Sequence, residues 1–90
     1  KTLQLNPKYY WAMAGVAEIL VIQQNYQEAI TYLERFLQFK PEDAWALSQL
    51  GLAYEKTNQV DQARKNYWQA LLFDPENTWI KQRWEAVEKL

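Results

Sequence analysis

Residues 44–77 read AWALSQLGLAYEKTNQVDQARKNYWQALLFDPEN, and the fold can be predicted from this segment. In both of its halves, apolar or small residues follow the i, i+3, i+4, i+7 spacing of one helix face. They are Leu47, Leu50, Gly51 and Tyr54 in the first half, and Val60, Ala63, Tyr67, Ala70 and Leu71 in the second. The stretch therefore predicts two amphipathic helices, the second of which ends at Asp74-Pro75, because the residue before proline disfavours the helical conformation.

The same pattern occurs 34 residues earlier, in residues 10–43. The prolines of the chain, Pro7, Pro41 and Pro75, are spaced by 34 residues, and superposing the two segments gives seven identities, where average composition would supply roughly two. The identical pairs are Trp11/Trp45, Ala12/Ala46, Ala29/Ala63, Leu37/Leu71, Phe39/Phe73, Pro41/Pro75 and Glu42/Glu76. We predict helices over residues 8–23, 26–39, 43–57, 60–73 and 77–89, with Asn25 and Glu28 forming a capping box.

The connections between these helices are short, so neighbouring helices should form antiparallel hairpins. One hairpin has no closed core of its own, so the hairpins must stack, and the sequence predicts an all-α solenoid. We divide the single domain 1–90 into the end of a preceding repeat (1–9), two full repeats (10–43 and 44–77) and a capping helix (78–90). The capping helix is predicted from an apolar stripe opposite charged positions. The stripe is Ile80, Trp84, Val87 and Leu90, and the charged positions are Lys81, Glu85 and Glu88.

The composition excludes several classes of function. Ten Lys and Arg balance eleven Asp and Glu, so the net charge of −1 disfavours nucleic acid as a partner. The chain contains no Cys and no His, which removes thiolate and imidazole chemistry and Cys/His zinc sites. The carboxylates are spread over helix faces expected to be solvated, and no apolar run is long enough for a membrane helix. We therefore expect no enzymatic activity, no cofactor and no metal, and a cytoplasmic protein, although a periplasmic or organellar one fits equally.

The repeat resembles the tetratricopeptide repeat, a unit of 34 residues with large and small residues at fixed offsets. The second repeat matches it at Leu47, Leu50, Gly51, Tyr54, Ala63, Tyr67, Ala70 and Pro75. The first repeat matches more loosely, at Met13, Val16, Ala17, Leu20, Ala29, Leu33, Phe36 and Pro41. Because Phe36 replaces a small residue, we expect its helix to lie further from its neighbour. The resemblance implies a right-handed superhelix whose first helices line a concave groove that holds a peptide or helix of a partner protein.

The groove-facing positions of the family can be assigned to this chain from their places in the repeat. We call these residues the groove row, and they lie on the first helix of each repeat and on the capping helix. These are Trp11, Ala14, Glu18, Val21 and Ile22, then Trp45, Ser48, Leu52, Glu55 and Lys56, and finally Trp79 and Gln82, followed by Ala86 and Lys89. The row is largely apolar and lacks the Lys and Asn that grip carboxylates in one subclass of the family. A tryptophan recurring every 34 residues fits two interpretations, groove contact or packing on the first helix of the next repeat. Trp68 is either an outer contact or a residue partly buried beside Phe36 or Tyr32.

The function predicted is a protein-interaction module in a scaffold or adaptor role, with no membrane insertion. One alternative is a structural fragment of a longer array that self-associates through its N-terminal end at Leu3 and Leu5. Another is an arm that recruits substrates for an attached enzyme.

Overall fold

The computed structural model describes residues 10–89, which form five helices joined by short turns. They are α1 (Tyr10–Ile22), α2 (Tyr26–Phe39), α3 (Ala44–Lys56), α4 (Val60–Phe73) and α5 (Thr78–Glu88). No strand occurs among residues 10–89, so the all-α prediction is confirmed. The predicted helix bounds agree to within one residue wherever they fall inside this range. The predicted repeat end at residues 1–9, with Leu3 and Leu5, lies outside the described residues, as does Leu90.

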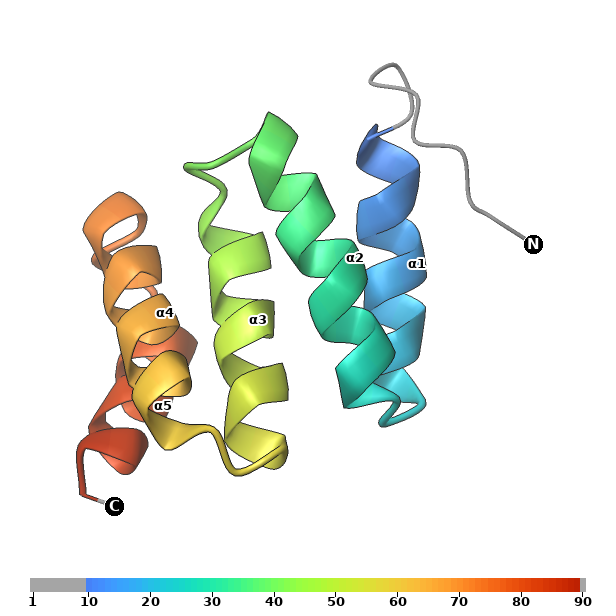
Figure 1. Cartoon of the computed structure of the whole chain (residues 1–90). Helices are drawn as coiled ribbons and strands as arrows, with labels where there is room; N and C mark the ends of the chain where they lie inside the picture. Colours follow the sequence, from blue (N-terminus) through green and yellow to red (C-terminus); the bar gives the residue numbers. More distant parts are fainter. Residues whose placement is uncertain (1–9, 90) are drawn as a thin grey trace.

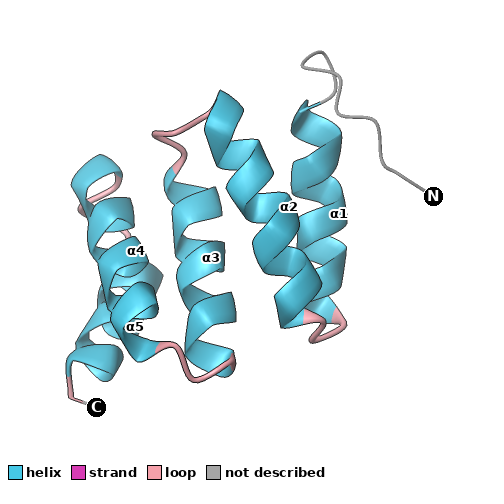
Figure 2. Cartoon of the chain, viewed as in Figure 1, coloured by secondary structure: helices cyan, strands magenta, loops and turns pink. Residues whose placement is uncertain are grey.

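The helices lie side by side, each antiparallel to the one before it (Figures 1 and 2). α1 pairs with α2 and α3 pairs with α4, while α2 also packs on α3 and so joins the two hairpins. α5 packs on α4 and touches α3. The result is an elongated stack of 40 × 24 × 19 Å, which is the solenoid that the repeat predicted.

The core lies between the helices, at the positions that define the repeat. In the second repeat, all seven matching helical positions are buried: Leu47, Leu50, Gly51, Tyr54, Ala63, Tyr67 and Ala70. In the first repeat, five are buried: Met13, Ala17, Ala29, Leu33 and Phe36. Phe36 is accommodated by an edge-to-face contact with Trp45 of α3, at 6.4 Å between ring centroids. The shared positions therefore hold both hairpins together and also join them.

The two turns inside the hairpins use the same backbone conformation but different residues. Asn58 has φ of 64° and Gln24, its equivalent in the first repeat, has φ of 65°. Asparagine tolerates this left-handed region better than glutamine does. The predicted capping box at Asn25 is wrong, because Asn25 precedes α2 without a side-chain bond to the helix. Its amide instead lies 3.4 Å from the side-chain oxygen of Gln23.

α5 has one buried and one exposed face, as its sequence pattern predicts. Ile80 and Val87 are buried and Trp84 is partly buried, whereas the charged positions Lys81, Glu85 and Glu88 are exposed. Asn77 is the N-cap of this helix, and its side-chain oxygen accepts the backbone N–H of Ile80 at 3.1 Å. Asp43 caps α3 in the same way, through the N–H of Ala46 at 2.9 Å. These caps satisfy donors that have no partner within the helix, and they define where α3 and α5 begin.

Candidate protein-interaction surface

The three tryptophans of the predicted groove row occupy matching places on α1, α3 and α5. Trp45 packs edge-to-face on Phe36 of α2, and Trp79 packs in the same manner on Tyr67 of α4, at 6.4 Å between centroids. These two rings therefore pack on the preceding second helix, a contact that the sequence analysis did not predict. Trp45 remains 36% exposed and Trp79 41% exposed, so one side of each indole is open to solvent. Trp11 is more exposed still.

The other apolar members of the row are also accessible. Ala14 and Val21 of α1 and Leu52 of α3 are partly buried, and Ile22 is exposed. Together with the tryptophans they are the apolar residues of the predicted row that solvent can reach.

Ser48 is the exception among the predicted row residues. It is buried, and its hydroxyl donates a hydrogen bond to the backbone carbonyl of Trp45 at 2.8 Å. Ala14, at the equivalent place on α1, is only partly buried. The reason is the number of neighbours: α3 lies between α2 and α4 and also touches α1 and α5. A partner cannot reach Ser48 in this structure, so we leave it out of the surface.

The polar members of the row are held in different ways. Glu18, Lys56 and Gln82 are exposed, as are Ala86 and Lys89 beyond them. Glu55 is partly buried, because one of its oxygens accepts the hydroxyl of Tyr67 at 2.9 Å and the other accepts Nη2 of Arg83. Glu55 therefore bonds three helices to each other and is fixed in place. Sequence reasoning missed Arg83, since nothing in the spacing links residues 28 positions apart.

Burial and this network also change proton affinities. Burial raises the pKa of the Tyr67 hydroxyl, and the neighbouring Glu55 raises it further, against the opposing effect of Arg83. The hydrogen bond to Glu55 raises the pKa of the Arg83 guanidinium. On the other side of α3, burial and then the hydrogen bond to Glu34 raise the pKa of Tyr54 to about 12. Tyr54 and Tyr67 are therefore neutral donors at neutral pH, which suits structural roles.

One interpretation of Trp68 was that it is partly buried beside Phe36 or Tyr32, and the structure shows instead that Trp68 is exposed. It is 51% exposed on α4, where it borders a hollow together with Trp84 of α5.

Among residues 10–89, no group of three or more acidic side chains is arranged to hold a metal ion. Within the same part of the chain, no helix has the length and apolar character needed to cross a membrane.

The stacked hairpins and the row of first-helix residues define a helical repeat protein. A family model, described as the tetratricopeptide repeat, matches residues 20–79, so the chain belongs to the tetratricopeptide repeat family. This family is one of protein-interaction modules, and it generally acts as non-enzymatic scaffolding.

Several known proteins are similar to the chain. Superkiller protein 3 of Schizosaccharomyces pombe is 26% identical over 97% of this chain, and anaphase-promoting complex subunit 3 of Dictyostelium discoideum is 28% identical over 87%. TPR repeat-containing protein MJ0263 of Methanocaldococcus jannaschii is 38% identical over 58% of the chain. The chain spans only 6%, 8% and 16% of these three proteins, respectively.

Proposed function

We propose that the chain holds a segment of a partner protein along the row formed by its first helices. The observation that supports this proposal is the exposure of Trp45 and Trp79 on one side while the other side packs on the preceding helix. A ring anchored in this way offers a large contact area with little remaining side-chain freedom, which is typical of residues that dominate binding energy. Trp11 and Ile22 of α1 and Leu52 of α3 are the other apolar members of the row.

The chemistry of the row favours an apolar partner segment, either an amphipathic helix or a hydrophobic peptide. The charged side chains of the row do not give it a net positive or negative charge. Glu55 is paired with Arg83, and the exposed Glu18 and Lys56 are opposite in charge. Selection would therefore depend on apolar side chains entering between the indoles. One of the similar proteins is named as a subunit of the anaphase-promoting complex, and a place in a protein assembly fits this proposal.

Replacing Trp45 and Leu52 together by alanine tests the proposal. Proteins retained by the immobilised chain would be identified by mass spectrometry, and each would then be titrated against purified wild-type and variant chains. We expect the double variant to lose affinity at least tenfold, while its circular dichroism stays helical. The matched control is Trp68→Ala, which removes an exposed indole from α4 and should leave the affinity unchanged. Equal affinity of the double variant and the wild type would show that the row is not the binding surface.

A second candidate, self-association, is favoured by the outer face of α1. Ala12, Val16 and Ile19 are exposed there, whereas the equivalent residues of α3 are buried within the stack. Those equivalents are Ala46, Leu50 and Ala53. The face of α1 thus has the composition of a helix-packing surface, and we propose that it packs on α1 of a second copy. Gly15, whose surroundings would leave a Cβ with nothing within 4 Å, would allow a close approach.

Sedimentation equilibrium tests self-association through α1, because it distinguishes a dimer from a monomer. The wild-type chain should form dimers at concentrations of tens of micromolar, and the double variant Val16→Gln with Ile19→Lys should remain monomeric with unchanged helicity. A wild-type chain that stays monomeric up to about millimolar concentration would exclude self-association through this face, while leaving the groove proposal intact.

A further inference from the structure

A polar cluster joins three helices beside the groove row, and we call it the polar latch. It consists of Glu55 of α3, Tyr67 of α4 and Arg83 of α5. One carboxylate oxygen of Glu55 accepts the Tyr67 hydroxyl at 2.9 Å, and the other accepts Nη2 of Arg83. Because hydrogen bonds are directional, these contacts fix where α4 and α5 lie relative to α3.

The polar latch is connected directly to Trp79 of the groove row. Trp79 packs edge-to-face on the ring of Tyr67, at 6.4 Å between centroids, and Tyr67 is completely buried. Arg83 follows Trp79 by four residues, so the two side chains lie one turn apart on one side of α5. The ring that supports the indole and the helix that carries it are therefore both bonded to Glu55.

The first repeat has different residues at the three positions of the polar latch. The equivalent residues, 34 positions earlier, are Val21, Leu33 and Gln49. Two of these are apolar and the third is uncharged, yet α1, α2 and α3 also pack on one another. Trp45, the counterpart of Trp79, is anchored there by the buried ring of Phe36. Packing of the repeat therefore does not require charged residues at these positions.

The shielded ion pair of the polar latch is a costly way to hold helices together. Removing two charges from water offsets most of their attraction, and replacing such a pair by apolar side chains often leaves stability unchanged or raises it. The side chains of Glu55 and Arg83 are only 17% and 30% exposed, so part of this cost applies here. Stability alone therefore does not explain the polar latch, whereas a directional contact that selects one orientation of α5 does.

α5 depends on a directional contact more than α3 does. α3 packs on both α2 and α4, whereas α5 packs on α4 and makes only a small contact with α3. The buried residues of α5, Ile80 and Val87, are apolar, and apolar contacts are not directional. Arg83 lies between these two residues in the chain and supplies the directional bond.

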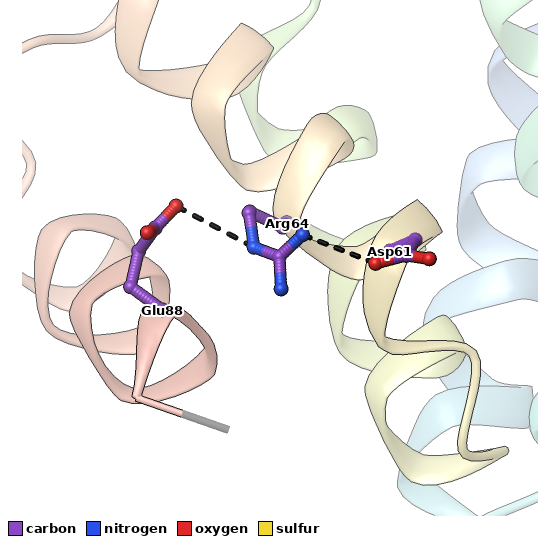
Figure 3. Close-up of polar contacts among 3 residues, drawn as sticks. All are labelled: Asp61, Arg64 and Glu88. Carbon is purple, nitrogen blue, oxygen red and sulfur yellow. Dashed lines mark hydrogen bonds and ion pairs between the residues drawn. The ribbon is translucent and has the colours of Figure 1, made fainter.

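A second ion pair links α4 to α5 at a more exposed place. Figure 3 shows Arg64 of α4 reaching toward Glu88 of α5, at 3.5 Å. The two side chains are 38% and 42% exposed, so solvent screens their attraction and the pair contributes little. This pair provides a matched control for the polar latch, because it joins the same two helices through the same types of charged group.

We propose that the three residues of the polar latch are positioning residues of the groove row. They set the angle of α5 and so hold Trp79 at a fixed distance from Trp45. The consequence for binding rests on the proposed groove function: a partner segment that spans both indoles loses less entropy when their spacing is already defined.

An apolar variant of the polar latch separates positioning from stabilisation. It carries Glu55→Leu, Tyr67→Phe and Arg83→Met, which keep the approximate side-chain sizes and the ring beside Trp79 but remove the polar bonds. We expect this variant to unfold at the same or a higher urea concentration than the wild type, because no buried charge or hydroxyl is left without a partner.

Spin labels measure the position of α5 directly. The chain contains no cysteine, so labels can be attached to introduced cysteines at chosen sites. Labels at the exposed Thr31 of α2 and Lys81 of α5 report where α5 lies, and labels at Thr31 and Gln62 of α4 provide the reference pair. Pulsed electron paramagnetic resonance should give an α2–α5 distance distribution at least twofold broader in the apolar variant than in the wild type, with the α2–α4 distribution unchanged.

Nuclear magnetic resonance relaxation measures the indoles themselves. In the apolar variant, the order parameter of the Trp79 indole N–H should fall, while that of Trp45 should stay at its wild-type value. Single Trp→Phe variants assign the resonances.

The control variant, Arg64→Met with Glu88→Leu, should keep both wild-type distance distributions. A further variant, Glu55→Gln with Arg83→Met, retains the buried tyrosine and an acceptor for its hydroxyl. It should broaden the α2–α5 distribution in the same way, and it decides the question if the apolar variant does not fold. The proposal would be overturned by unchanged distances and an unchanged Trp79 order parameter in the folded latch variants. Equal broadening in the control would also overturn it.

These measurements use no partner, so their outcome is separate from that of the proposed groove function. The titrations with Trp45→Ala and Leu52→Ala test the groove, and a groove that binds nothing would leave the distances between the helices as they are.

Discussion

At the scale of single residues, the two glycines of the chain occupy first helices but have opposite surroundings. Gly51 of α3 lies against the buried ring of Tyr67, where an added Cβ would stand 2.9 Å from Cδ1 and 3.0 Å from Cε1. Gly15 of α1 has open space at the same point. The closeness of α3 and α4 therefore depends on the missing side chain of Gly51, whereas α1 gains nothing comparable from Gly15.

Alanine at these two positions should accordingly have opposite effects. Gly51→Ala should lower the free energy of unfolding by about 1–3 kcal/mol, because the ring of Tyr67 has no room to retreat. Gly15→Ala should raise it by about 0.5–1 kcal/mol through helix propensity alone. Urea unfolding followed by circular dichroism measures both changes. Equal effects of the two substitutions would mean that the contact between Gly51 and Tyr67 does not limit the packing.

Tyr54 gives a residue-scale prediction about alkaline pH. Its hydroxyl donates to Glu34 at 2.6 Å, and its pKa is raised from 10.0 to about 12, mainly by burial. A raised pKa in the folded state means that the stabilisation is complete below pH 10 and is lost as the pH rises toward 12. The free energy of unfolding should therefore fall between pH 10 and pH 12, and that of the Tyr54→Phe variant should fall less steeply than that of the wild type. Identical slopes for the two proteins would show that Tyr54 does not contribute to the alkaline loss.

At the scale of the elements, α5 is attached to the second hairpin by both apolar and polar contacts. Ile80 and Val87 are buried against the stack, and Arg83 bonds to Glu55 of α3, which also holds the hydroxyl of Tyr67 of α4. The side chain of Glu55 is only 17% exposed, so the pair is partly shielded from water. Losing one partner of such a pair leaves the other charge uncompensated.

Arg83→Gln should therefore weaken the attachment of α5 in particular. We expect a loss of about 1–2 kcal/mol in stability, with faster amide hydrogen exchange in α5 and little change in α1 and α2. Lys81→Gln removes a cation from the exposed side of the same helix and serves as the control, with unchanged exchange. Uniformly faster exchange in all helices of the Arg83 variant would contradict a local role for this bond.

At the scale of the whole molecule, the two hairpins cooperate through the contact of α2 with α3. Phe36 is 5% exposed and meets Trp45 across this interface. Stability in a stack of repeats is approximately the sum of each repeat and its interfaces with neighbours. Weakening this one interface should therefore uncouple the hairpins rather than unfold them both together.

Phe36→Ala, which introduces the residue found at the equivalent Ala70, should lower stability by about 3 kcal/mol through the cavity that it leaves. Hydrogen exchange in α1 and α2 should then become faster than in α3 and α4. Phe73→Ala removes the same ring from a position that is 46% exposed, and it should cost less than about 1 kcal/mol. A single cooperative loss of protection in all helices would argue that the hairpins remain coupled without Phe36.

The helices, their bounds and the faces that they bury could be predicted from the sequence, because the proline spacing and the apolar periodicity are local patterns that each helix carries independently. The sequence also predicted that α5 has one apolar and one charged face. The packing of the helices was needed to show that Ser48 is covered, that Glu55 is bonded to Arg83, and that Trp68 borders a hollow with Trp84 of α5. These features depend on how many helices surround each position and on contacts between residues far apart in the chain, which no local pattern encodes.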